Sequence, residues 1–87
     1  MTEESVIEFP TEFPIKLMGR NTPEFRVMAR ALIEKHAGTV NDEAVQTASS
    51  SNDRFVSVTV TITATSQQQL DAIYQDATDH ENVLMAL

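Results

Sequence analysis

Residues 55–64 read Phe-Val-Ser-Val-Thr-Val-Thr-Ile-Thr-Ala, so apolar and hydroxyl side chains alternate almost without a break. Successive side chains of a β-strand point to opposite faces, which gives this strand one apolar face and one hydroxyl face. Every residue from Val56 to Thr63 except Ser57 is β-branched, which favours a half-buried sheet. The pattern predicts a central strand of a sheet covered on one side only. We expect function on its open face.

The first half of the chain predicts a strand and then a helix. Phe13–Arg20 alternates in the same way as the long strand, and residues 19–22 then turn the chain. Thr22 suits the N-cap of a helix over residues 23–37, which opens with proline and ends before Gly38, a residue suited to a left-handed cap. The residues expected to be buried follow helical spacing: Phe25, Met28, Ala29, Leu32, Ile33 and His36.

The second half predicts two strands, a helix and a last strand. Glu43–Ser49 carries little bulk, which is typical of an edge strand, and a turn at 50–53 leads into the long strand. Ser66 and Gln69 form a capping box that opens the second helix, and Glu81–Leu87 is the expected last strand. The apolar stripe of that helix is Leu70, Ile73, Tyr74 and Ala77. The helix residues expected toward solvent are Asp71, Asp76 and Asp79.

This order is βαββαβ, the ferredoxin-like plan of the α+β class. Right-handed crossovers place both helices on one face of a four-stranded antiparallel sheet, with strands one and three in the centre and two and four at the edges. We expect a single domain over residues 9–87 after a flexible arm at 1–8. Phe9 and Phe13 are expected to pack onto this domain.

Composition limits the partners. Thirteen acidic residues against six Lys and Arg give a net charge of −7, so phosphate backbones and anionic lipid would repel the chain. We therefore expect neither nucleic acid nor a membrane as a partner. The start of the sequence lacks the order of a signal peptide, and no apolar run approaches the roughly 20 residues that span a bilayer, so we expect a cytoplasmic protein. Without cysteine there is neither a disulfide nor a thiolate metal site.

Six blocks carry a family resemblance: 8–10 (Glu-Phe-Pro), 13–19 (Phe-Pro-Ile-Lys-Leu-Met-Gly), 49–52 (Ser-Ser-Ser-Asn), 57–59 (Ser-Val-Thr), 69–74 (Gln-Leu-Asp-Ala-Ile-Tyr) and 83–87 (Val-Leu-Met-Ala-Leu). The chain resembles the YbeD-like family of small bacterial proteins of undefined function, sometimes labelled lipoate regulators. The resemblance implies an ACT-like fold, in agreement with the order above. It supplies no catalytic residues, and Phe55 stands where relatives often carry Tyr, so no role of that hydroxyl is carried over.

A candidate ligand site lies where the first strand meets the first helix. Exposed N–H groups at a helix start attract anions, and Arg20 can add a bidentate contact to a carboxylate or phosphate. ACT domains bind small amino-acid-like effectors near the corresponding loop, so the resemblance indicates the same place. The structural alternative is that Gly19 is a bend and Thr22 a cap. The candidate ligand-binding residues are Gly19, Arg20, Asn21 and Thr22.

The open sheet face is a second candidate site. An RNA-recognition sheet of this topology carries stacking aromatics on its central strands, whereas the pattern here predicts hydroxyls, a methionine and two cations. A protein partner or self-association is favoured over RNA, because Met and Arg are frequent at interfaces. The simplest interpretation of this face is a solvated hydroxyl surface with no partner. The expected interaction residues are Lys16, Met18, Ser57, Thr59, Thr61 and Thr63, with Arg20 at the end of the row.

The sequence carries no recognisable catalytic motif. His36 and His80 have neither a Cys nor a carboxylate at a metal-ligand spacing, and we expect them to be structural. No serine lies in a nucleophile elbow, and there is no glycine-rich phosphate loop. We expect no catalytic residue, no metal and no cofactor.

Two functions follow as hypotheses. The first is a non-catalytic regulatory or adaptor domain that binds a protein partner, or a second copy of itself, through the open face or an edge strand. The alternative is an ACT-type sensor of an amino acid or other carboxylate, bound at the turn of residues 19–23 between the first strand and the first helix.

Overall fold

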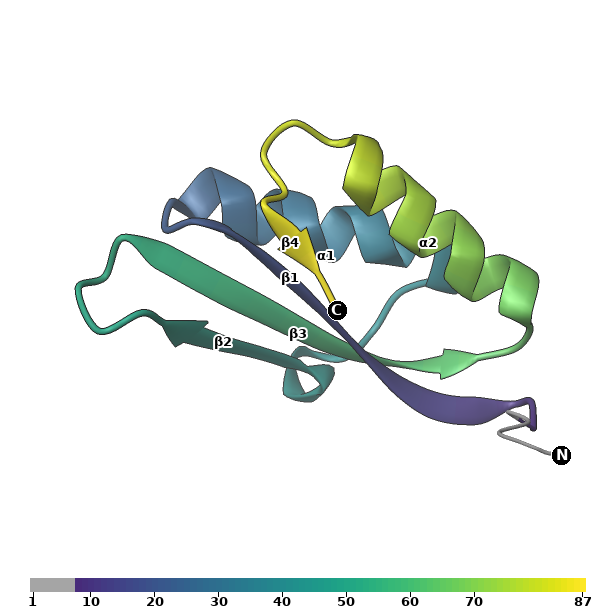
Figure 1. The fold of residues 1–87 in the computed structure, drawn as a ribbon. Helices are drawn as coiled ribbons and strands as arrows, with labels where there is room; N and C mark the ends of the chain where they lie inside the picture. The colour runs from purple at the N-terminus through teal and green to yellow at the C-terminus, as the bar shows by residue number, and fades with distance from the viewer. Residues whose placement is uncertain (1–7) are drawn as a thin grey trace, which may run out of the picture.

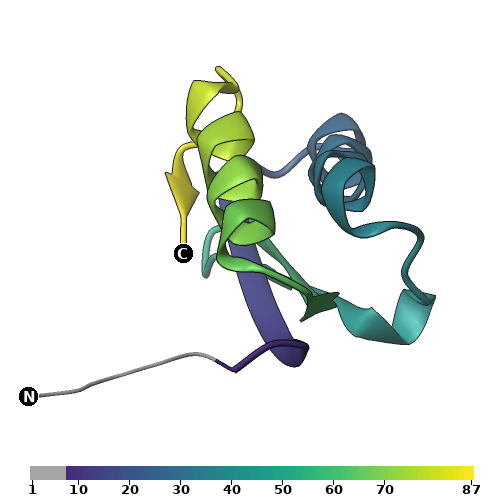
Figure 2. The same ribbon diagram turned by 90° about the vertical axis from the view of Figure 1, so that its right-hand side faces the viewer.

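The computed structural model describes residues 8–87, so the expected arm at 1–8 falls, apart from Glu8, outside the described residues. Two helices cover one face of a four-stranded antiparallel sheet and leave its other face open (Figures 1 and 2). The sheet order is β2-β3-β1-β4, which confirms the predicted α+β plan with strands one and three in the centre. The elements are β1 (Thr11–Arg20), α1 (Pro23–Ala37), the 3₁₀ helix η1 (Asp42–Ala44), β2 (Val45–Ser49), β3 (Phe55–Ala64), α2 (Gln67–Asp79) and β4 (Met85–Ala86).

The alternation along β3 is the basis of the core. Its apolar residues Val56, Val58, Val60, Ile62 and Ala64 are all at most 2% exposed and lie under the helices. The remaining core residues come from β1, α1 and α2: Ile15, Leu17, Phe25, Ala29, Leu32, Ile33, Leu70, Ile73 and Ala77. Phe9 and Phe13 pack against this core, as predicted. The coverage of one sheet face only is therefore confirmed.

Both helices begin at the predicted caps. The Thr22 hydroxyl accepts a hydrogen bond from the Phe25 N–H, and the Ser66 hydroxyl accepts one from the Gln69 N–H, each at 3.0 Å. The Gln69 side chain accepts from the Thr65 N–H and donates to the His36 carbonyl, so it ties the start of α2 to the end of α1. Local capping chemistry thus also fixes how the two helices meet.

The two edge strands differ from the expected ranges. β2 begins at Val45, because Asp42–Ala44 form a 3₁₀ turn before it. The expected last strand Glu81–Leu87 shrinks to the two residues of β4, preceded by a turn at 81–82. One backbone hydrogen bond still joins Leu84 to Met18, and two join Leu87 to Lys16.

Pairing on the β4 side of β1 involves only the second half of β1. Lys16 exchanges two backbone hydrogen bonds with Leu87, and the Met18 carbonyl accepts one from Leu84, so even-numbered residues of β1 turn their backbone groups toward β4. Pro14 is the next residue on this side, and it has no N–H to donate. No described residue pairs with the first half of β1 on this side, so that half is an edge although β1 is central in the strand order.

Candidate functional site

The open sheet face carries a compact group of basic and apolar side chains. Strand register sets Ser57, Met18 and Met85 side by side across β3, β1 and β4. In the neighbouring row Lys16 lies opposite Thr59, and its backbone pairs with Leu87 on the other side. We call the following residues the open-face patch: Lys16, Met18, Arg20, Phe55, Met85 and Leu87.

Phe55 corrects the prediction that this face lacks aromatic side chains. It is the first residue of β3 and shares the face of Ser57, opposite Arg20. The Arg20 guanidinium carbon lies 5.8 Å from the centre of the Phe55 ring, which is a cation–π distance. One half-buried ring is far from the stacking platform of an RNA-binding sheet, but it gives the patch an aromatic anchor.

Two of the six Lys and Arg residues of this acidic protein lie in the patch, and a third directly precedes it in the sequence. Arg30 pairs with Glu34 and Asp42, Lys35 pairs with Asp76, and Arg26 donates to the Asn21 side chain. Lys16, Arg20 and Arg54 make no ion pair within residues 8–87. The first two lie in the patch, and Arg54 directly precedes Phe55 at the end of the β2–β3 turn.

The other end of the face has a different character. Thr61 and Thr63 lie opposite Pro14 and Glu12, and the Glu12 side chain is exposed. Four of the six predicted interaction residues therefore come together around the patch: Lys16, Met18, Ser57 and Thr59. Thr61 and Thr63 lie away from it, on the acidic side of the same face.

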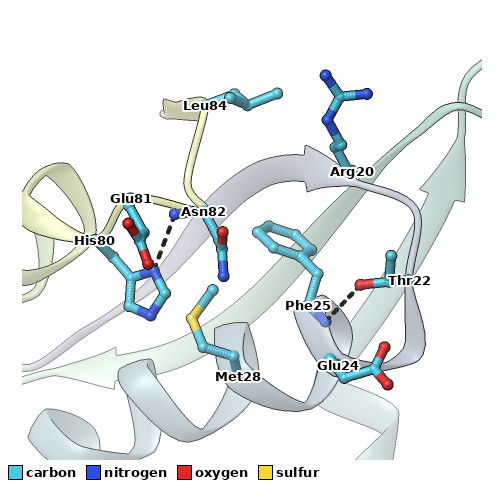
Figure 3. Close-up of a pocket in the computed structure, with 9 residues that line it drawn as sticks. All are labelled: Arg20, Thr22, Glu24, Phe25, Met28, His80, Glu81, Asn82 and Leu84. Atoms are coloured by element: carbon cyan, nitrogen blue, oxygen red, sulfur yellow. Dashed lines mark hydrogen bonds between the residues drawn. The ribbon is translucent and has the colours of Figure 1, made fainter.

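A pocket of about 440 Å³ adjoins the patch at the start of α1. Figure 3 shows Phe25 and Met28 at its base, between the α1 N-terminus and the connection from α2 to β4. The lining residues are Arg20, Thr22, Glu24, Phe25, Met28, His80, Glu81, Asn82 and Leu84. Such a volume suits a small molecule that offers both apolar and polar groups.

Two of the four predicted ligand residues line this pocket, and two do not. Arg20 and Thr22 do. Asn21 instead contacts Arg26 and the Asp53 carbonyl. Gly19 is not a bend: it is a buried residue of β1. A side chain at Gly19 would collide with the Phe25 ring, so this glycine makes room for packing.

The electrostatics of the pocket do not favour a simple anion. Thr22 already occupies the Phe25 N–H, and the Arg26 N–H donates to the Thr22 carbonyl, so few donors at the start of α1 are left. Glu24 and Glu81 also line the pocket, together with Arg20. A ligand that carries both charges fits this arrangement better than a phosphate does.

Comparison with known proteins places the chain in a family. A family model described as a protein of unknown function, DUF493, matches residues 4–87. The chain belongs to this family.

The relatives of this DUF493 protein match over nearly their whole lengths. A UPF0250 protein of Nitrosomonas europaea is 42% identical over 87 residues, covering all of both chains. One from Paraburkholderia phytofirmans is 40% identical, covering 97% of this chain and 94% of its own. The solution structure of HP0495 from H. pylori aligns with a TM-score of 0.71 at 16% identity, covering 98% of this chain and 89% of that one. The YbeD-like resemblance is thus confirmed, and the structural match supports the fold alone.

Both histidines of this DUF493 protein have structural partners. His36 Nε2 lies 2.9 Å from Asp76 Oδ2, and Lys35 Nζ lies 2.6 Å from the same oxygen. These contacts, that of Lys35 first, lower the pKa of Asp76, and they correct the prediction that Asp76 points to solvent. His80 Nδ1 accepts a hydrogen bond from the Asn82 N–H. Within residues 8–87 no group of three potential metal ligands comes together.

The same described part of the chain contains no helix that is long and apolar enough to cross a bilayer.

The sequence prediction missed Phe55, Met85 and Leu87 as members of the candidate surface. The alternation of the strand could have placed Phe55 on this surface, because residues 55 and 57 point to the same face of the sheet. Met85 and Leu87 can be placed on it only when the register of β4 against β1 is known.

Proposed function

We propose that this protein is a non-catalytic adaptor or regulatory domain of the cytoplasm that binds a protein partner through the open-face patch. The observation that carries the proposal is the gathering of Lys16 and Arg20, which have no acidic partner within residues 8–87, around exposed apolar side chains. Met85 is 50% exposed and lies opposite Met18, Leu87 is 60% exposed and pairs with Lys16, and the Phe55 ring lies opposite Arg20 on the other side of β1. Met, Arg and aromatic residues are enriched at interfaces between proteins.

The test is affinity capture from an extract of the native cell with two matched variants. Thr59→Glu puts a carboxylate opposite Lys16, directly beside the patch. Thr47→Glu makes the same exchange on β2, opposite Val58 and therefore on the other side of the sheet. We expect a specific protein to be captured by the unmodified chain and by Thr47→Glu, and lost with Thr59→Glu. Capture of nothing specific, or equal capture by all three, contradicts the proposal.

A second candidate function rests on the pocket at the start of α1. Arg20 offers a positive charge, Glu24 and Glu81 offer negative charges, and Phe25 and Met28 offer an apolar base, so a small zwitterion such as an amino acid fits. Binding would raise the unfolding temperature, because ligand at 100 times its dissociation constant adds about 2.7 kcal/mol of stability. An unchanged melting temperature across a panel of amino acids and carboxylates removes this candidate.

A further inference from the structure

The charges at the open-face patch indicate what kind of partner segment it accepts. Lys16 and Arg20 lie four residues apart on β1 and point to the same face, with Met18 between them. At about 3.3 Å per strand residue the two cations are separated by about 13 Å. The patch therefore presents positive, apolar, positive along one strand, with Met85 and Leu87 widening the apolar part toward β4.

We propose that the open-face patch binds an extended acidic segment of a partner protein, with carboxylates at positions i and i+4 and an aliphatic or aromatic side chain at i+2. An extended segment directs positions i, i+2 and i+4 to the same side at the same spacing of about 13 Å. The two carboxylates then reach Lys16 and Arg20, and the apolar side chain lies on Met18. This inference rests on the proposed function and names the chemistry of its partner.

Charge supports an acidic protein segment over the other occupants. A basic segment would be repelled by the patch and drawn to the acidic remainder of this chain, whose net charge is −7. A nucleic acid repeats its charge along its whole length, so it would meet Glu12 at the far end of the same face. A short segment with two carboxylates needs only the local cations, because charges beyond about 8 Å are screened at physiological salt.

Fluorescence anisotropy with labelled peptides tests the inference on the intact chain. The probe contains Glu-Thr-Leu-Thr-Glu between Gly-Ser flanks. One control peptide replaces both Glu with Lys, and another replaces Leu with Ser. A thymidine octanucleotide tests nucleic acid as the occupant, and light scattering tests a second copy of this chain. We expect each control peptide to bind at least about tenfold more weakly than the probe, and the probe to weaken several-fold between 50 and 300 mM salt.

The two threonine variants locate the binding. Thr59→Glu is expected to weaken binding of the probe about tenfold, because the new carboxylate neutralises Lys16. Thr47→Glu is expected to change the affinity for the probe less than twofold. The inference is overturned by equal binding of the three peptides, by tighter binding of the octanucleotide, by insensitivity to Thr59→Glu, or by a dimer that dissociates only in that variant. If cell extracts yield a partner that depends on Thr59 while the peptides fail, the acidic chemistry is wrong and the proposed function stands. If both fail, both are wrong.

Discussion

Replacing Gly19 by alanine should destabilise the protein, because the added Cβ would collide with two identifiable neighbours. Gly19 is buried in β1, and a Cβ there would lie 2.6 Å from Phe25 Cδ1 and 2.7 Å from the Asn82 carbonyl oxygen. Ordinary contacts between such atoms are about 3.5–4.0 Å. The ring cannot swing away freely, because Phe25 is only 4% exposed, and the Asn82 oxygen belongs to the backbone.

The size of the effect follows from two opposing terms. Overpacking of a core costs about 1–3 kcal/mol, and two blocked neighbours place Gly19→Ala toward the upper end of that range. Loss of glycine's freedom in the unfolded chain returns about 0.4–1 kcal/mol. We therefore expect the free energy of unfolding to fall by about 2 kcal/mol and the melting temperature by about 8–16 °C.

Urea denaturation of four chains separates this collision from a general effect of losing a glycine. In a Phe25→Leu background the ring is gone but the Asn82 oxygen remains, so the cost of adding Gly19→Ala should fall by about 1 kcal/mol and not disappear. The matched control is Gly38→Ala. Gly38 has a φ of 83° with no atom within 4 Å of an added Cβ, so its cost is of backbone origin and independent of Phe25. A Gly19→Ala protein as stable as the unmodified chain, or an equal cost in both backgrounds, would refute the reasoning.

Three further predictions address the caps, the ion pairs and the edge strand. Thr22→Ala should lower the free energy of unfolding by about 1 kcal/mol in urea melts, because the Phe25 N–H loses its acceptor; an unchanged midpoint would contradict the cap. The pKa of Asp76, followed by NMR, should lie below its ordinary value of 3.8. The carboxylate then contributes its full stabilisation above pH 3.8 and loses it as the pH falls through the lowered pKa, and Asp76→Asn removes this part of the acid dependence. A pKa at or above 3.8 speaks against the contact with Lys35. Deleting Leu87 removes both backbone hydrogen bonds to Lys16 and should cost about 1–3 kcal/mol by calorimetry, and a truncated chain that melts like the full one would show that the pair is weak.

Much of the fold could be predicted because its signals are local. The alternation of β3 fixed which side is buried, and Thr22 and Ser66 marked both helix starts through hydrogen bonds to residues only three positions away. Such short-range chemistry does not depend on the rest of the molecule. With right-handed crossovers, the βαββαβ order of elements then allows one simple sheet topology, with strands one and three in the centre.

The missed features depend on contacts between distant parts of the chain. The pocket joins Thr22 and Phe25 to residues about 55–60 positions later, and Asp76 meets His36 across 40 residues. Gly19 looked like a turn residue, because the sequence does not reveal the ring that packs against it. The shortness of β4 results from the turn after α2, where the Val83 N–H donates to the His80 carbonyl, and the sequence pattern does not show where this turn ends.

The central claim is that the open-face patch is the surface on which this protein binds its partner. The most direct test maps amide shifts of the isotope-labelled protein as a captured partner, or the acidic probe peptide, is added. We predict shifts that cluster at the patch and at its neighbours Ser57 and Thr59, with the acidic end at Thr63 unaffected. Shifts confined to the outer faces of α1 and α2, or to the pocket residues His80–Asn82, would contradict the account.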